Sequence, residues 1–283
     1  MTHAFPAPGK LNLFLHVVGR RADGYHLLQS AFRLIDRGDT VHLALRADGR
    51  VIRESALAGV PESADLAVRA ARLLQPFAAK YHGVSIRVEK RLPMGGGLGG
   101  GSSDAATVLL ALNRLWGIHF PRPRLQALAL QLGADVPFFV YGQTAFAEGV
   151  GERLRPFAAP PAWYVVLVPP VSVATATVFA APELTRDTPA ITITPFSGGP
   201  EFALDATRND LQPVVLARYP EVARHLAWLA RFGPARMTGS GACVFAPFDS
   251  EDAAHAVLRA MPEGMQGFMA QGLDRHPLYE YCD

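Results

Sequence analysis

A run of glycines at residues 93–106, PMGGGLGGGSSDAA, is the part of this 283-residue sequence that most directly indicates chemistry. Main chain without Cβ atoms lets an anion approach the unpaired N–H groups at a helix start, where the helix dipole is positive. The run follows the β-rich stretch VSIRVEK and precedes residues 103–116, whose apolar character predicts a buried helix ended by Gly117. We therefore expect a phosphate-binding loop rather than a flexible linker. The loop comprises Gly95, Gly96, Gly97, Leu98, Gly99, Gly100 and Gly101.

The better-known glycine loops do not fit this run. A Walker A loop needs lysine before Ser or Thr, and Gly101 occupies that position. A dinucleotide-binding fold needs a following strand that ends in an acidic residue, whereas GIHFPRPR intervenes here. The glycine loop of protein kinases forms a hairpin, whereas this one opens a helix. A different phosphate-binding loop is required, in which Ser102 or Ser103 caps the helix or faces a Mg²⁺ ion.

Two charged residues elsewhere suit phosphoryl transfer. Lys10 shares one face of a predicted half-buried strand, residues 9–18, with Asn12, and an ammonium there can neutralise charge on the transferring group. Asp135, in GADVPFF, can orient a hydroxyl and accept its proton late in a loose transition state. The alternatives are a surface lysine and an aspartate that caps a helix or turn.

The elements expected around these residues are mixed rather than strictly alternating, which favours the α+β class. The boundary of two domains, 1–160 and 161–283, is placed near FAAPPAW. Predicted strands cover 9–18, 31–46, 50–54, VSIRVEK, YVVLVPP and ACVFAPF, and predicted helices cover 66–77, 103–116, 122–132, 209–217, 220–231 and 251–261.

The composition excludes several classes of protein. With 18% charged residues and a net charge of +2, the chain has no dense basic stripe for nucleic acid. No apolar run spans a membrane and no signal peptide is indicated, so we expect a cytoplasmic protein. Cys243 and Cys282 are expected to be free thiols, and no spacing of His and Cys indicates a dedicated metal site.

The loop resembles that of the GHMP kinases, which runs Pro-x-x-x-Gly-Leu-Gly-Ser-Ser or close to it. Three further stretches strengthen the resemblance and stand in the family's order: residues 8–32, 132–152 and 237–245. Residues 181–205 carry no motif of the family. The resemblance implies a two-domain fold, with an N-terminal half like ribosomal protein S5 domain 2, a C-terminal ferredoxin-like sandwich and the active site in the cleft between them. It also implies ATP and Mg²⁺ as cofactors.

The resemblance further implies the role of each site residue. Asp135 is the base and Lys10 the charge-stabilising partner. The expected nucleotide-binding residues are Leu66, Lys90, Pro93, Met94, the loop residues 95–101, Ser102 and Ser103, and the expected substrate-binding residues are Asn12, Tyr25, His26, Phe179, Thr238, Gly239, Ser240 and Gly241.

The similarity is narrowest to the family members that phosphorylate a cytidyl diphosphate sugar alcohol at its 2-hydroxyl in isoprenoid precursor synthesis. Tyr25 and His26 would then hold the cytosine, with Phe179 as a second ring. Two alternatives stay open: a kinase of the homoserine or mevalonate type, and a ligand sensor without catalysis. Asp65 departs from the family's asparagine and puts an adenine-side contact in question. We expect a monomer or weak homodimer.

Overall fold

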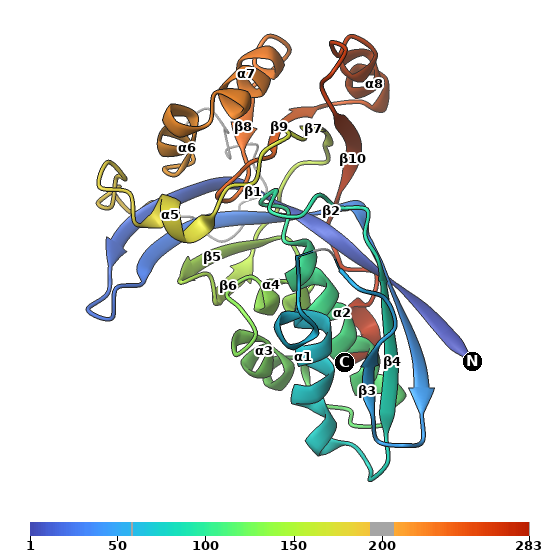
Figure 1. The fold of residues 1–283 in the computed structure, drawn as a ribbon. Helices are drawn as coiled ribbons and strands as arrows, with labels where there is room; N and C mark the ends of the chain where they lie inside the picture. Colours follow the sequence, from blue (N-terminus) through green and yellow to red (C-terminus); the bar gives the residue numbers. More distant parts are fainter. Residues whose placement is uncertain (58, 193–206, 283) are drawn as a thin grey trace.

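The computed structural model describes residues 1–57, 59–192 and 207–282. Its described strands form one mixed sheet of ten strands, in keeping with the expected α+β class (Figure 1). The strands are β1 (Thr2–Arg20), β2 (His26–Arg46), β3 (Val51–Arg53), β4 (Gly83–Glu89), β5 (Ala145–Gly149), β6 (Arg153–Pro156), β7 (Trp163–Leu167), β8 (Arg236–Met237), β9 (Val244–Phe248) and β10 (Gly267–Leu273).

The long strands β1 and β2 form an antiparallel hairpin that runs through the centre of the molecule (Figure 1). The other edge of β2 pairs in turn with β5, β10 and β4. The main path of the sheet is β3-β4-β2-β10-β7-β9-β8, so β10 joins the first half of the chain to the second. Only β3 and β4 are parallel among the described pairs. The hairpin therefore belongs to both halves and can present side chains to the space between them.

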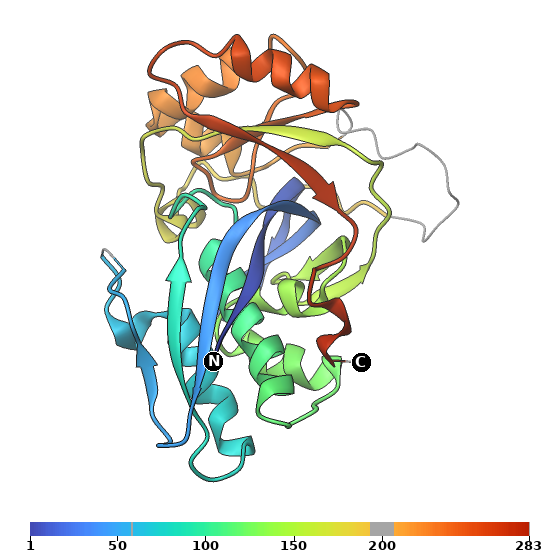
Figure 2. The same ribbon diagram turned by 90° about the vertical axis from the view of Figure 1, so that its right-hand side faces the viewer.

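The helices form two groups, one for each half of the sheet (Figures 1 and 2). Helices α1 and α2 pack on β1–β4, α3 and α4 pack against α2, and α7 and α8 pack on β7, β9 and β10. Helix α5 lies beside the half of the hairpin that ends in its turn (Figure 1). The helices are α1 (Leu66–Leu74), α2 (Gly100–Leu115), α3 (Arg122–Leu130), α4 (Val136–Tyr141), α5 (Thr175–Phe179), α6 (Gln212–Arg218), α7 (Pro220–Leu229) and α8 (Glu251–Arg259).

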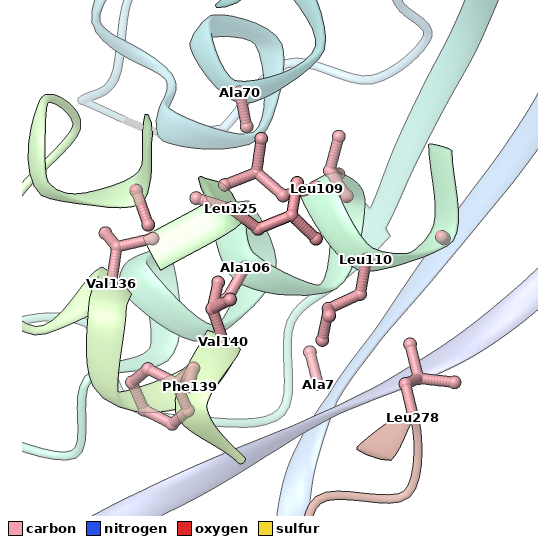
Figure 3. Close-up of a cluster of buried hydrophobic side chains, with 14 of the residues drawn as sticks. Ala7, Ala70, Ala106, Leu109, Leu110, Leu125, Val136, Phe139, Val140 and Leu278 are labelled. Carbon is pink, nitrogen blue, oxygen red and sulfur yellow. The ribbon is translucent and has the colours of Figure 1, made fainter. Parts of the chain in front are cut away.

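Helix α2 is the centre of the first hydrophobic core, as its apolar sequence predicts. Every residue from position 103 to position 113 is buried. Figure 3 shows Leu109 and Leu110 of α2 among side chains from α1, α3 and α4, including Leu125 and Val140. Small residues such as Ala106 let the helices approach closely. This packing fixes the N-terminal end of α2, where the glycine loop lies.

The predicted helices and strands are found with their ends shifted by three residues or fewer, except that β1 begins at Thr2 rather than at residue 9 and β2 begins at His26 rather than at residue 31. The expectation of a half-buried strand at 9–18 is wrong, because both faces are buried from Gly9 to Val17. The second half of the chain covers part of this strand: Leu15 and Val17 pack in its core, and Thr238 and Asp210 accept from the backbone amides of Asn12 and Val17. Phe77 lies beyond the end of α1 and is 44% exposed rather than packed in the helix.

The division at residue 160 stays a prediction. The segment between β6 and β7 contains that point, but the chain returns through β10, and Leu278 and Cys282 lie in the core of the first half. Of the stretch without a motif, residues 193–205 lie outside the described part of the chain. Within the described part, no helix is long and apolar enough to cross a membrane.

Candidate active site

The glycine loop is held between β1 and the turn at residues 238–241. The amide of Lys10 donates to the carbonyl of Leu98 at 3.0 Å, which ties the loop to β1. The amides of Ala242 and Cys243 donate to Gly95 and Gly96 at 3.3 and 3.2 Å. Helix α2 starts directly after Gly99, so its first N–H groups, which have no partner within the helix, lie at this junction.

Neighbouring atoms of the protein exclude a side chain at Gly97 and at Gly99. A Cβ atom at Gly97 would lie 2.2 Å from the carbonyl oxygen of Thr238, and one at Gly99 would lie 2.9 Å from the Phe139 ring. Both glycines also have positive φ, of +76° and +71°, which other residues rarely adopt. At Gly101 a Cβ would meet only Leu66, at 3.8 Å. Contacts within the protein therefore explain Gly97 and Gly99, whereas no close contact in the described part of the chain excludes a side chain at Gly101.

Two cavities meet at this loop. The larger, of about 730 Å³, extends from the loop along the hairpin to α5, and the smaller, of about 400 Å³, extends toward α1. Gly95, Gly97, Gly99 and Ser102 line both. The smaller cavity has Leu57, Val60, Leu66 and Met94 in its wall and is mostly apolar. A nucleoside can thus lie on one side of the loop and a second substrate on the other, with phosphates at the loop between them.

Lys10 and Asp135 form an ion pair in the wall of the larger cavity. The Lys10 ammonium lies 3.5 Å from a carboxylate oxygen of Asp135, and the side chains are 3% and 37% exposed. Lys10 also donates to the amide oxygen of Asn12, which orients the ammonium. Asp135 immediately precedes α4, yet its side chain makes no capping hydrogen bond there. The carboxylate is therefore available to a ligand in the cavity.

The turn at residues 238–241 is held by hydrogen bonds from Asn12 and Asn209. The hydroxyl of Thr238 accepts a hydrogen bond from the backbone amide of Asn12 at 2.9 Å. The side-chain amide of Asn209 donates to the carbonyls of Met237 and Gly239, each at 2.8 Å. Asn209 itself is buried. The turn, the glycine loop and the strand that carries Lys10 thus form one hydrogen-bonded unit.

Tyr25 and His26 lie at the far end of the larger cavity, at the tip of the hairpin. Gly24 makes the bend with φ of +90°, as the Asp23-Gly24 pair predicts. Tyr25 is 65% exposed, so its ring is free to stack on a ligand. His26 packs against Phe179 with ring centroids 5.0 Å apart.

The Lys90 ammonium is paired with two carboxylates. Its ammonium donates to Asp104 at 2.8 Å and to Asp39, behind the start of α2. Burial disfavours the ammonium, but Asp104 and Asp39 outweigh it and raise the pKa of Lys90. Burial raises the pKa of Asp104 to about 7, Lys90 opposes the rise and Asp39 adds to it. Lys90 and Asp104 still reach the wall of the smaller cavity.

Asp65 has a structural partner on each side. Its carboxylate accepts from the amide of Ala67 at 2.9 Å, which caps α1, and pairs with Arg53 at 3.2 Å. Because both oxygens are engaged, the departure from asparagine is explained by these contacts.

All but two of the predicted site residues gather in the cavity walls. The two exceptions are buried behind the walls. Ser103 donates its hydroxyl to the carbonyl of Pro8 at 2.6 Å, and the Thr238 hydroxyl accepts from the amide of Asn12. In the described part of the chain, no group of three or more His, Cys, Asp or Glu is arranged to hold a metal. Sequence reasoning missed Asp39 and Asp104, which pair with Lys90, and Asn209, which holds the turn. It also missed Arg186, which donates to His26 at 3.2 Å. The adjacent Asn209 and Asp210 after a stretch without motif were the available signal.

The chain matches two families of known domains. Residues 65–143 match the GHMP kinases N terminal domain, and residues 200–267 match the GHMP kinases C terminal family. The relative from Thiobacillus denitrificans, a 4-diphosphocytidyl-2-C-methyl-D-erythritol kinase, is 72% identical over 99% of both chains. The kinase of that name from Nitrosospira multiformis is 59% identical over 98% of this chain and 94% of its own.

Solved structures agree with these matches. A crystal structure of 4-(cytidine 5'-diphospho)-2C-methyl-D-erythritol kinase has a TM-score of 0.79 and 34% identity, covering 95% of this chain and 99% of its own. Homoserine kinase from Cytophaga hutchinsonii has a TM-score of 0.68 at 16% identity, covering 97% and 95%, and shares the fold alone. The chain therefore belongs to the GHMP kinase family, in the group of the 4-diphosphocytidyl-2-C-methyl-D-erythritol kinases.

Proposed function

We propose that this chain transfers the γ-phosphoryl group of ATP to the 2-hydroxyl of 4-diphosphocytidyl-2-C-methyl-D-erythritol, in the non-mevalonate route to isoprenoid precursors. The observation that carries the proposal is the Lys10–Asp135 pair, 3.5 Å apart, in a cavity that shares the glycine loop with a second cavity. The smaller cavity takes the nucleoside of ATP, and the larger takes the cytidyl substrate.

Each of these residues has a separate role in the in-line transfer of the phosphoryl group. Asp135 holds the 2-hydroxyl toward the γ-phosphorus and accepts its proton as the new O–P bond forms. The bond between the γ-phosphorus and the bridging oxygen breaks, and ADP leaves with that electron pair. Lys10, held by Asn12, stabilises the negative charge on the transferring group. Loop amides and the first N–H groups of α2 bind the phosphates.

Mg²⁺ bound with ATP would neutralise phosphate oxygens as the group is transferred. Ser102, which lines both cavities, would hold the ion. Ser103 does not suit it, because its hydroxyl is buried and donates to Pro8.

Tyr25 and His26 favour the cytidyl substrate over smaller alcohols. They lie at the far end of a cavity of about 730 Å³, a volume that homoserine or mevalonate would leave largely empty. The test is ADP release with a panel of alcohols: the cytidyl compound, homoserine and mevalonate. The proposal expects turnover with the cytidyl compound alone. Turnover with either small alcohol, or with none of the three, would contradict it.

A further inference from the structure

Arg186 holds the ring of His26 from outside the cavity. Its Nε–H group donates to His26 Nε2 at 3.2 Å. Its other guanidinium nitrogens donate to the carbonyls of Phe179 at 3.2 Å, Ala181 at 2.6 Å and Leu184 at 3.0 Å. With a further bond to the carbonyl of Pro182 at 3.5 Å, five contacts fix the guanidinium and hold its Nε–H group toward His26.

This contact determines where the His26 ring carries its proton. A guanidinium stays protonated and has donors only, so the Nε2 atom facing it must accept. Burial lowers the pKa of His26, and the nearby cations Arg186 and Arg20 lower it further. The imidazole is therefore neutral at physiological pH, and its single proton lies on Nδ1.

The Nδ1–H group is available to a ligand. His26 lines the larger cavity, and its ring is steadied by Phe179. Within the described residues, its only hydrogen-bonding side-chain partner is Arg186. A pyrimidine stacked on Tyr25 would meet this donor at its edge. Cytosine has an acceptor at ring nitrogen N3, whereas uracil has an N–H group there.

We propose that Arg186 is a positioning residue that holds His26 in the Nδ1–H tautomer, so that the site offers a donor to N3 of the base and selects cytosine over uracil. The inference rests on the proposed function and extends it, because Arg186 belongs to neither cavity wall. It predicts the tautomer of His26 in the protein without substrate and the preference for cytosine over uracil, and the two are measured separately.

The first test is the tautomer itself. Protein labelled with ¹⁵N in histidine is studied by long-range ¹H–¹⁵N NMR without ligand, and the His26 signals are assigned from a His26→Gln sample. The wild type should show the Nδ1–H tautomer, and Arg186→Met should lose this preference. Arg218→Met is the matched control: Arg218 pairs with Glu183 at 2.6 Å in the same segment and does not touch His26. An Nε2–H tautomer in the wild type would overturn the inference.

The second test is base selection. Affinities for CDP and UDP are measured by calorimetry, and kcat/KM is compared for the cytidyl and uridyl forms of the substrate. Arg186→Met should lower the preference for cytosine about ten- to a hundredfold, the effect of one mispaired buried hydrogen bond. Arg186→Lys, which keeps a cation and a donor, should retain more of it, and Arg218→Met should retain all of it.

The outcomes separate this inference from the proposed function. An unchanged preference in Arg186→Met, in a protein that melts as the wild type does, would refute the role of Arg186. Failure to phosphorylate the cytidyl compound would instead refute the proposed function. In that case, tighter binding of CDP than of UDP, lost in Arg186→Met, would still support base reading by His26.

Discussion

Replacing Asp104 by asparagine should stabilise the protein at alkaline pH. Two buried carboxylates, Asp104 and Asp39, share the single ammonium of Lys90. One Asp104 oxygen has no hydrogen-bond partner among the described residues. The ionised form is therefore costly, and Asp104→Asn removes one negative charge while leaving Asp39 to pair with Lys90.

The pKa of Asp104 gives the size of the effect and its pH range. The folded protein raises this pKa from 3.8 to about 7, so between these values the folded state binds more protons than the unfolded state. Stability of the wild type should fall as pH rises through this range, because the buried carboxyl loses its proton. A difference of about three pKa units corresponds to a destabilisation of about 4 kcal/mol, which is complete above pH 7 and absent below pH 4.

Urea unfolding at pH 5 and pH 8 measures the difference. Asp104→Asn should be more stable than the wild type at pH 8, and its advantage should be several kcal/mol smaller at pH 5. Asp39→Asn is the matched control. In Asp39→Asn the side-chain oxygen keeps the bonds from the amides of Arg91 and Leu92, at 2.6 and 2.8 Å, so the new NH₂ group faces the Lys90 ammonium in place of an acceptor. This variant should therefore be destabilised at both pH values. An Asp104→Asn advantage that is equal at both pH values would refute the reasoning.

Three further predictions concern the ligands and the turn. Gly101→Ala should keep the wild-type melting temperature, since the new Cβ meets only Leu66 at 3.8 Å, but should raise KM for ATP; an unchanged KM would place phosphates elsewhere. In Asn209→Asp a carboxylate oxygen replaces the NH₂ group that donates to two carbonyls, so kcat/KM should fall at least about tenfold. The control Asn113→Asp, at another buried asparagine, should not lower kcat/KM in activity assays corrected for the folded fraction. Tyr25→Ala should raise KM for the cytidyl substrate about ten- to a hundredfold and leave KM for ATP unchanged, and an effect on ATP alone would remove Tyr25 from base stacking.

Local patterns were sufficient to predict the elements around the loop. The apolar stretch at 103–116 predicted a buried helix, and α2 spans Gly100–Leu115 with its middle fully buried. The alternation at 9–18 predicted a strand but not its burial. That strand is partly covered by residues about 200 positions later, such as Thr238, which accepts from the backbone amide of Asn12, and alternation within ten residues contains no information on such a partner.

Prediction of the site from the sequence is limited in the same way. Motif resemblance indicated Lys10, Asp135 and the loop, which lie together in the structure. Asn209 and Arg186 are hydrogen bonded to other residues of the site, and they come from segments whose place depends on the tertiary fold. The reason for the glycines also needed the structure. At Gly97 the obstacle to a Cβ is the carbonyl of Thr238, a collision that the sequence could not indicate.

The most direct test of the central claim is the effect of Asp135→Asn on chemistry and on ATP binding, measured on one preparation. Single-turnover phosphorylation of the cytidyl substrate should slow by about two to four powers of ten, the usual loss for a general base, with ATP affinity by calorimetry unchanged. Asp252→Asn, at the exposed start of α8, is the control and should match the wild type in both. Near wild-type turnover in Asp135→Asn, or lost ATP binding with an unchanged chemical rate, would contradict the account.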